Sequence, residues 1–226
     1  PNATLALSDK YHQVIVFTAV SPNNKNQNKI NLLKQAHMVI YFPLEDEYTL
    51  LVRVVGPFCA YHAINTFLNH YFGTKFMLIQ PNIDVEAKLV DYIIKSKPQI
   101  KIITGDFMKQ FAQNLQYKFM EGSFYPSMVD ICDFFEFSHG HYQNLLENKA
   151  RGNATLVIIL HNEKQISLAD ALIDMCQLHS IPVFNLQSNY GDQDILYYEL
   201  YFNQIMFGMV QAWDIDQINW RGKDDN

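Results

Sequence analysis

The sequence has little of what several specialised classes of protein require. Its cysteines, Cys59, Cys132 and Cys176, number three and form no Cys-x-x-Cys pair, which argues against a disulfide framework and a cysteine zinc site. No apolar run approaches the roughly 20 residues of a membrane helix, and no charged segment precedes a signal-like apolar stretch. We therefore expect a protein of the reducing cytoplasm with no membrane segment.

Positive charge is also scarce. Seventeen Lys and Arg face 23 Asp and Glu, for a net charge of −6 and a pI near 5.7. This balance argues against a duplex nucleic acid or an anionic membrane as partner, because nothing gathers positive charge for phosphates. The six histidines outside residues 139–141 show neither His-x-His nor His-Glu-x-x-His spacing, so we assign no metal and no cofactor.

What the sequence does have is length and apolar content. Its 226 residues are 49% hydrophobic and 18% charged, enough to bury one core or two small ones. Short β-branched runs alternate with helical patterns along the chain. The continuous apolar runs that we expect to be strands are 14–18, 38–42, 76–79, 100–104, 155–160 and 181–184.

Apolar residues three and four apart predict the helices between these strands. They span 29–36, 50–71, 85–96, 107–120, 141–149, 167–178 and 195–213. Alternating parallel strands and helices predict a three-layer α/β sandwich of the doubly wound, flavodoxin type. The long helix ending near residue 71 divides the chain into a partial first half, residues 1–74, and a second half, residues 75–226.

Two features after the 100–104 strand suggest chemistry. The strand ends in Thr104-Gly105 and turns into a helix, whose free N–H groups are suited to a polar or anionic ligand. That helix delivers Glu121, followed by Ser123, to its C-terminal end. Glu121 is either a catalytic base or a solvated surface acid, and the residue pattern alone leaves both open.

Farther along, Glu136-Phe-Ser-His139-Gly140 follows an aromatic segment. The ordered set of Gly105, Glu121-Gly-Ser123 and this element resembles the second half of the SIS (sugar isomerase) family of phosphosugar-binding proteins. The C-terminal stretch from Asp214 to Lys223 is similar to that family's Asp-x-Asp-x-Pro-x-x-Leu-x-Lys tail, with Ile218 where proline is usual. The plainer interpretation of the tail is a solvated chain end.

The resemblance implies an SIS-like fold and aldose–ketose isomerisation, or a related deglycase-like reaction, on a phosphorylated sugar or amino sugar. By it, Glu121 moves the proton, His139 opens the sugar ring and Lys223 assists from the tail. It also implies a homodimer, because in such proteins the histidine reaches the neighbouring subunit's site. The residues it implies for substrate binding are Thr104, Gly105, Ser123, Glu136 and Gly140, with Ser21 in the first half.

Ser21 marks the main departure from the family. SIS proteins hold the phosphate with a Ser-x-Ser-Gly-x-Thr loop, which this sequence lacks. Residues 18–24 are the nearest substitute, but Pro22 removes a backbone donor there. Three hypotheses stay open: a sugar-phosphate enzyme, a non-catalytic sensor of a sugar phosphate that controls a partner, and a structural remnant that dimerises through the aromatic helix 195–213.

Overall fold

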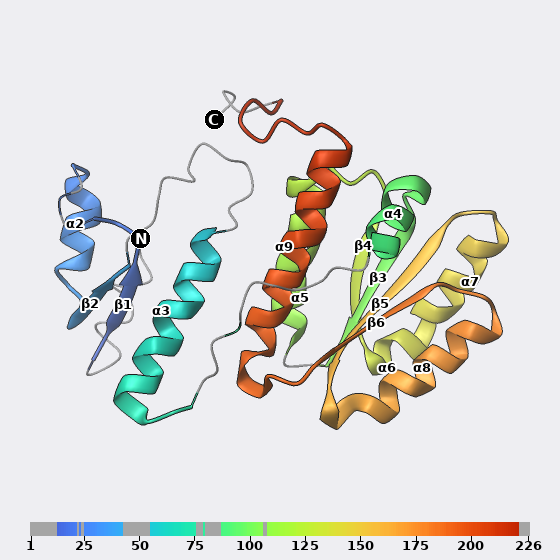
Figure 1. Ribbon diagram of the computed structural model, residues 1–226, viewed down its shortest axis with the longest axis horizontal. Coiled ribbons are helices and arrows are strands. Elements are labelled where there is room, and N and C mark those ends of the chain that lie inside the picture. Colours follow the sequence, from blue (N-terminus) through green and yellow to red (C-terminus); the bar gives the residue numbers. More distant parts are fainter. Residues whose placement is uncertain are drawn as a thin grey trace. The chain divides into compact units, whose positions relative to one another are not determined.

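The computed structural model describes residues 13–21, 23, 25–42, 55–75, 79, 87–105 and 108–221. The chain divides into two compact units, Pro1–Phe76 and Met77–Asn226 (Figure 1). Each unit has its own parallel sheet.

The first unit contains a β-α-β element followed by a long helix. Its elements are β1 (Ile15–Thr18), α2 (Gln27–Leu33), β2 (Met38–Tyr41) and α3 (Val55–Phe72). β1 and β2 pair in parallel, a geometry that needs a crossover connection, and α2 lies on that connection. Phe67 of α3 meets Phe17 of β1 edge-on, with ring centroids 5.5 Å apart, so the helix packs against this strand pair.

The second unit is built on a four-stranded parallel sheet. Its strands are β3 (Gln99–Thr104), β4 (Val129–Asp133), β5 (Thr155–Asn162) and β6 (Val183–Ser188), in the order β4-β3-β5-β6. β3 and β5 are buried along almost their whole length, as continuous apolar strands covered on both faces should be.

Helices cover both faces of this sheet, with α5 and α9 on one side of the strands and α6, α7 and α8 on the other (Figure 1). Ile100 and Ile102 pack with α4, α5 and α9, whereas Ile103 packs with α6, α7 and α8, because successive strand residues point to opposite faces. The helical elements are α4 (Ala87–Ser96), α5 (Lys109–Tyr117), the π-helical turn η2 (Lys118–Gly122), α6 (Phe134–Glu136), the π-helical segment η3 (Phe137–His141), α7 (Tyr142–Ala150), η4 (Glu163–Gln165), α8 (Ile166–Leu178), η5 (Gly191–Gln193) and α9 (Asp194–Ala212). The predicted three-layer, doubly wound α/β architecture is confirmed.

One strand, β4, was not predicted from the sequence. Its sequence, Val-Asp-Ile-Cys-Asp, interrupts the apolar residues with acidic ones, because β4 lies at the edge of the sheet and is only partly covered. Of the predicted strand at 76–79, residues 76–78 lie outside the described residues. Among the described residues, no helix combines the length and apolar character needed to cross a membrane.

Candidate functional site

Glu121 and Ser123 lie at the amino edge of the second sheet. α5 starts beyond the carboxyl end of β3 and runs back, so η2 and the residues after it reach the start of the strand. Tyr125 fixes this position, since its hydroxyl donates to the carbonyl of Pro98 at 2.6 Å. Glu121 is exposed in η2, whereas Ser123 is buried and its hydroxyl donates to the carbonyl of Phe119 at 2.9 Å. Ser123 therefore closes the helix end.

The C-terminal tail lies against this same turn. Gln217 donates its side-chain amide to the carbonyl of Gly122 at 2.6 Å. Trp213, at the end of α9, stacks on Tyr125 with ring centroids 6.1 Å apart and an interplanar angle of 17°. Two motifs far apart in sequence, the Glu121 turn and the tail, are thus brought together. Lys223, the tail residue expected to assist catalysis, lies outside the described residues.

His139 and Gly140 form an exposed kink between α6 and α7. His139 has φ −102° and ψ +48°, and Gly140 has φ +119°, a conformation that favours glycine. The kink belongs to the face of the sheet opposite to α5, because Phe137 joins one core cluster and Phe119 joins the other. Within one chain, His139 and Glu121 therefore belong to elements on opposite faces.

Glu136 takes part in a capping box that starts α6. Asp133 accepts hydrogen bonds from the N–H groups of Phe135 and Glu136, both at 2.8 Å, and Glu136 accepts one from the N–H of Asp133 at 3.0 Å. Lys109 contacts the other oxygen of Glu136 at 2.5 Å. This hydrogen bond, together with that from Asp133, holds the pKa of Glu136 below its usual value. Glu136 therefore orients the helix that precedes His139.

Thr104 and Gly105 lie at the opposite, carboxyl edge of the sheet. The sheet order reverses between β3 and β5, and such crevices beyond the carboxyl ends of parallel strands are where open α/β sheets bind ligands. A Cβ on Gly105 would stand 1.9 Å from the side-chain nitrogen of Gln165, so only glycine admits this side chain as it lies. The hydroxyl of Thr104 is buried and has no hydrogen-bond partner among the described residues.

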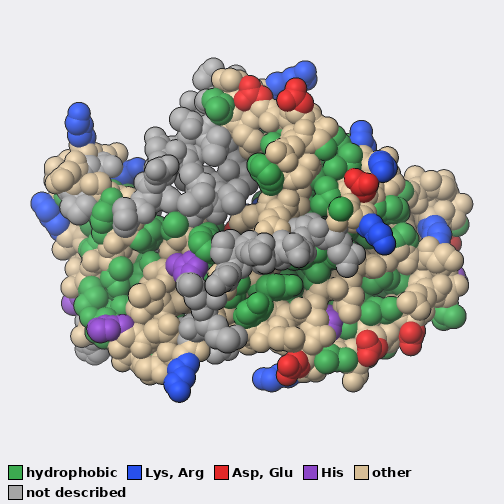
Figure 2. Space-filling view, in the orientation of Figure 1, with side chains coloured by type: hydrophobic (Ala, Val, Ile, Leu, Met, Phe, Trp, Pro, Cys, Tyr) green, Lys and Arg blue, Asp and Glu red, His purple; other side chains and the backbone are tan. Residues whose placement is uncertain are grey.

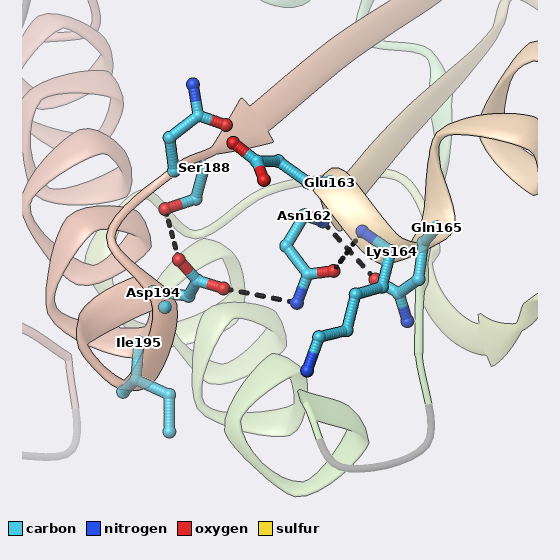
Figure 3. A pocket seen from close by; sticks show the side chains of 9 residues that line it. Asn162, Glu163, Lys164, Gln165, Ser188, Asp194 and Ile195 are labelled. Atoms are coloured by element: carbon cyan, nitrogen blue, oxygen red, sulfur yellow. Dashed lines mark hydrogen bonds between the residues drawn. The ribbon is translucent and has the colours of Figure 1, made fainter.

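A pocket of about 600 Å³ opens at this carboxyl edge, where β5 and β6 end and α9 begins (Figure 3). This pocket was not predicted from the sequence. The available signal was a polar residue closing each apolar strand, Asn162 and Ser188. The pocket is lined by Asn162, Glu163, Lys164, Gln165, Ser188, Asn189, Gly191, Asp194 and Ile195.

Asp194 is the most buried charged group of this pocket, with 2% of its surface exposed. Ser188 donates to one of its carboxylate oxygens at 2.5 Å, and the side-chain amide of Asn162 donates to the other at 3.4 Å (Figure 3). Asn162 is held in turn by a capping box with Gln165, whose side-chain oxygen accepts from the Asn162 N–H at 3.3 Å. The carboxylate is therefore a fixed hydrogen-bond acceptor.

A second buried charge, Lys101, faces the kink that carries His139. The Lys101 side chain is 2% exposed, pairs with Asp130 on the neighbouring strand and lies 3.2 Å from Nδ1 of His141. Burial alone would raise the pKa of Asp130, but the hydrogen bond and charge of Lys101 outweigh it and hold the pKa below its usual value. This cluster joins β3 and β4 to η3, and no pattern in the sequence pointed to it.

Ser21 belongs to the first unit, where it follows β1. Its hydroxyl accepts a hydrogen bond from the N–H of Asn23 at 3.2 Å. Pro22 and Asn24 lie outside the described residues.

Cys132 is buried in the second unit, and burial raises the pKa of its thiol to about 12, which makes it a poor nucleophile. Among the described residues, no group of three or more His, Cys, Asp and Glu side chains lies close enough to hold a metal ion.

Comparison with solved structures supplies the wider context. The chain is similar to the C-terminal domain of glucosamine-fructose-6-phosphate aminotransferase from Francisella tularensis, with a TM-score of 0.57. The match covers 96% of this chain and 69% of that one at 10% sequence identity. The chain has an SIS-like fold. No protein-family model matches the sequence, and no curated protein matches it.

Within this SIS-like fold, the residues selected from the sequence fall into three places. Glu121 and Ser123 meet the tail at the amino edge, Thr104 and Gly105 lie at the carboxyl edge, and His139 and Gly140 stand exposed beside β4. One copy of the second unit therefore does not gather the expected set into a single cluster.

Proposed function

We propose that this chain binds a phosphorylated sugar or amino sugar and isomerises it between aldose and ketose. The solved structure that shares its fold is named as a domain of a glucosamine-fructose-6-phosphate aminotransferase, a name that refers to a sugar phosphate. The observation that carries the proposal is the contact between Gln217 and Gly122, which holds the tail against the Glu121 turn. Two of the motifs shared with SIS proteins thereby occupy one place.

The reaction needs a base that moves a proton between adjacent carbons and a group that opens the ring. In the proposal, the Glu121 carboxylate takes the proton from C2 of the open-chain aldose and returns it to C1. Glu121 is exposed, so a substrate can reach its carboxylate. His139 opens the ring by moving the proton of the C1 hydroxyl to the ring oxygen as the bond between C1 and that oxygen breaks, a step suited to an imidazole near neutral pH. Lys223 assists from the tail.

In this proposal, His139 acts in the site of a second copy, because it stands on the opposite face of the sheet from the helix that delivers Glu121. A homodimer then forms two sites, each with Glu121 from one subunit and His139 from the other. His139 and Gly140 are both exposed, in keeping with contact to a second subunit. The substrate-binding roles of Thr104, Gly105, Ser123, Glu136 and Ser21 remain predictions from the resemblance.

The test measures deuterium incorporation by NMR, at C1 of fructose 6-phosphate and at C2 of glucose 6-phosphate and glucosamine 6-phosphate, after a thermal-shift screen of the same compounds. We expect one of them to raise the melting temperature and to exchange its proton. Glu121→Gln should abolish the exchange and keep the binding, whereas Glu147→Gln, an exposed carboxylate on α7, should change neither. If the proton exchange persisted in Glu121→Gln, Glu121 would not be the base.

Mixed dimers test the shared site. Glu121→Gln and His139→Ala should each be inactive alone. Mixed, they should regain about a quarter of the wild-type activity, because half of the dimers are mixed and each of these has one intact site. No recovery after subunit exchange would contradict the contribution of His139 from a partner.

A non-catalytic sensor of a sugar phosphate is the second candidate. It is favoured by the absence from the sequence of a Ser-x-Ser-Gly-x-Thr loop and by the proline that follows Ser21. A sugar phosphate that stabilises the protein without any exchange at C1 or C2 would establish this alternative.

We propose that the protein is cytoplasmic, in keeping with its three free cysteines. We propose no nucleic-acid or membrane partner. On the face drawn in Figure 2, the coloured Lys and Arg side chains lie scattered and form no dense cluster, which supports this view.

A further inference from the structure

The pocket at the carboxyl edge is separate from the Glu121 turn. It lies beyond the ends of β5 and β6, whereas Tyr125 ties the segment after Glu121 to the residue before β3. Parallel strands place these two edges about 20 Å apart over the six residues of β3. The pocket therefore cannot be the place in this unit where Glu121 meets substrate.

Its polar groups are arranged to accept hydrogen bonds. The Asp194 carboxylate offers about four lone-pair sites, of which Ser188 and Asn162 use one each. It lies in the first turn of α9, where the helix dipole stabilises its negative charge. A buried and anchored carboxylate with acceptor capacity left is suited to ligand groups that donate hydrogen bonds.

The charge of the pocket selects against anions. Asp194 and Glu163 carry two negative charges and Lys164 carries one positive charge, which leaves a net charge of −1. Within the described part of the chain, Glu163 and Lys164 take part in no ion pair, so both stay available at the rim (Figure 3). A phosphate or carboxylate group would meet like charge here.

We propose that this pocket binds an uncharged ligand through two neighbouring hydroxyl groups that donate to the Asp194 carboxylate. Such a diol occurs in a sugar ring and in the ribose of a nucleoside. The volume of about 600 Å³ falls within the range of small-molecule sites. Ile195 supplies an apolar contact for the C–H face of the ring, and Glu163 accepts a further hydroxyl at the rim.

The probes are methyl β-D-glucopyranoside, which cannot open its ring and so cannot be isomerised, and adenosine. Binding is measured by saturation-transfer NMR titration at millimolar concentrations. We expect at least one probe to saturate, and 2′,3′-dideoxyadenosine, which lacks the diol, not to bind. Binding of the glucoside alone assigns the pocket to free sugars, and binding of adenosine alone assigns it to a ribose.

Variants locate the binding. Asp194→Asn should lower the affinity for the probe about tenfold or more, the loss expected when a hydrogen bond to a charged group is removed. Glu163→Gln, at an exposed rim position, should weaken it less, and it decides the matter if Asp194→Asn does not fold. Glu147→Gln and Glu121→Gln should leave it unchanged. Saturation by neither probe, or equal affinity in the Asp194, Glu163 and Glu147 variants, would overturn the proposal without affecting the Glu121 test.

Discussion

A buried ion pair between Lys118 and Glu199 joins the end of α5 to α9, directly beside the Glu121 turn. The Lys118 ammonium lies 2.8 Å from Glu199 and donates to Asn203 at 2.7 Å, while Asn114 donates to the other Glu199 oxygen at 3.2 Å. The Lys118 and Glu199 side chains are 4% and 0% exposed. Water therefore cannot take the place of either partner.

We expect Glu199→Leu and Lys118→Met each to lower the free energy of unfolding of the second unit by about 3–5 kcal/mol, the cost of one uncompensated buried charge. The double variant removes both charges. Its stability should return to within about 2 kcal/mol of wild type, because replacing a whole buried pair by apolar side chains is often neutral. The two losses are therefore expected to be strongly non-additive.

Urea titration followed by tryptophan fluorescence measures these values. Both tryptophans, Trp213 and Trp220, belong to the second unit, so their signal reports its unfolding. The control is Asp91→Asn, which breaks an exposed pair with Lys95 and should cost less than about 1 kcal/mol. Additive losses, or single-variant losses as small as the control, would refute the argument that burial makes this pair essential.

Two further predictions concern the segment around His139. Because Lys101 holds the pKa of Asp130 below its unfolded value, the stabilisation is present above that value and is lost as pH falls through the folded pKa. In Asp130→Asn, the free energy of unfolding should therefore fall less steeply as the pH drops below about 4. If its dependence on pH matched that of the wild type, the pairing of Asp130 with Lys101 would be contradicted. Gly140→Ala should cost about 1–3 kcal/mol in urea titration, since φ is +119° with open space around it, whereas Ser138→Ala should cost little.

The strands that could be predicted from the sequence are those whose burial requires an uninterrupted run of apolar residues. β3 and β5 are covered on both faces and appear as uninterrupted apolar runs. β4 was not predictable by this rule, because an edge strand keeps polar residues such as Asp130 and Asp133 among its apolar ones. Its position beside β3 also required the topology of the whole sheet.

The candidate site was less predictable than the fold. Gly105 and Glu121 are close in sequence, but a helix that follows a strand in a parallel sheet runs back along it. The two residues therefore end at opposite edges, and the tail, much farther along the chain, is what meets Glu121. The pocket was missed because its residues come from two separate connections, after β5 and after β6, and single polar residues such as Asn162 and Ser188 carry no distinctive pattern.

The residues that carry the SIS resemblance fall into two groups: those that the local structure explains and those that it does not. Ser123 closes a helix end and Glu136 belongs to a capping box, so local structure is sufficient to explain both. Gly140 is required by its positive φ. Glu121 and His139 are exposed, and no hydrogen bond or ion pair within the described part of the chain engages their side chains. Because packing does not account for these two residues, they are the ones whose substitution most directly tests catalysis against a purely structural role.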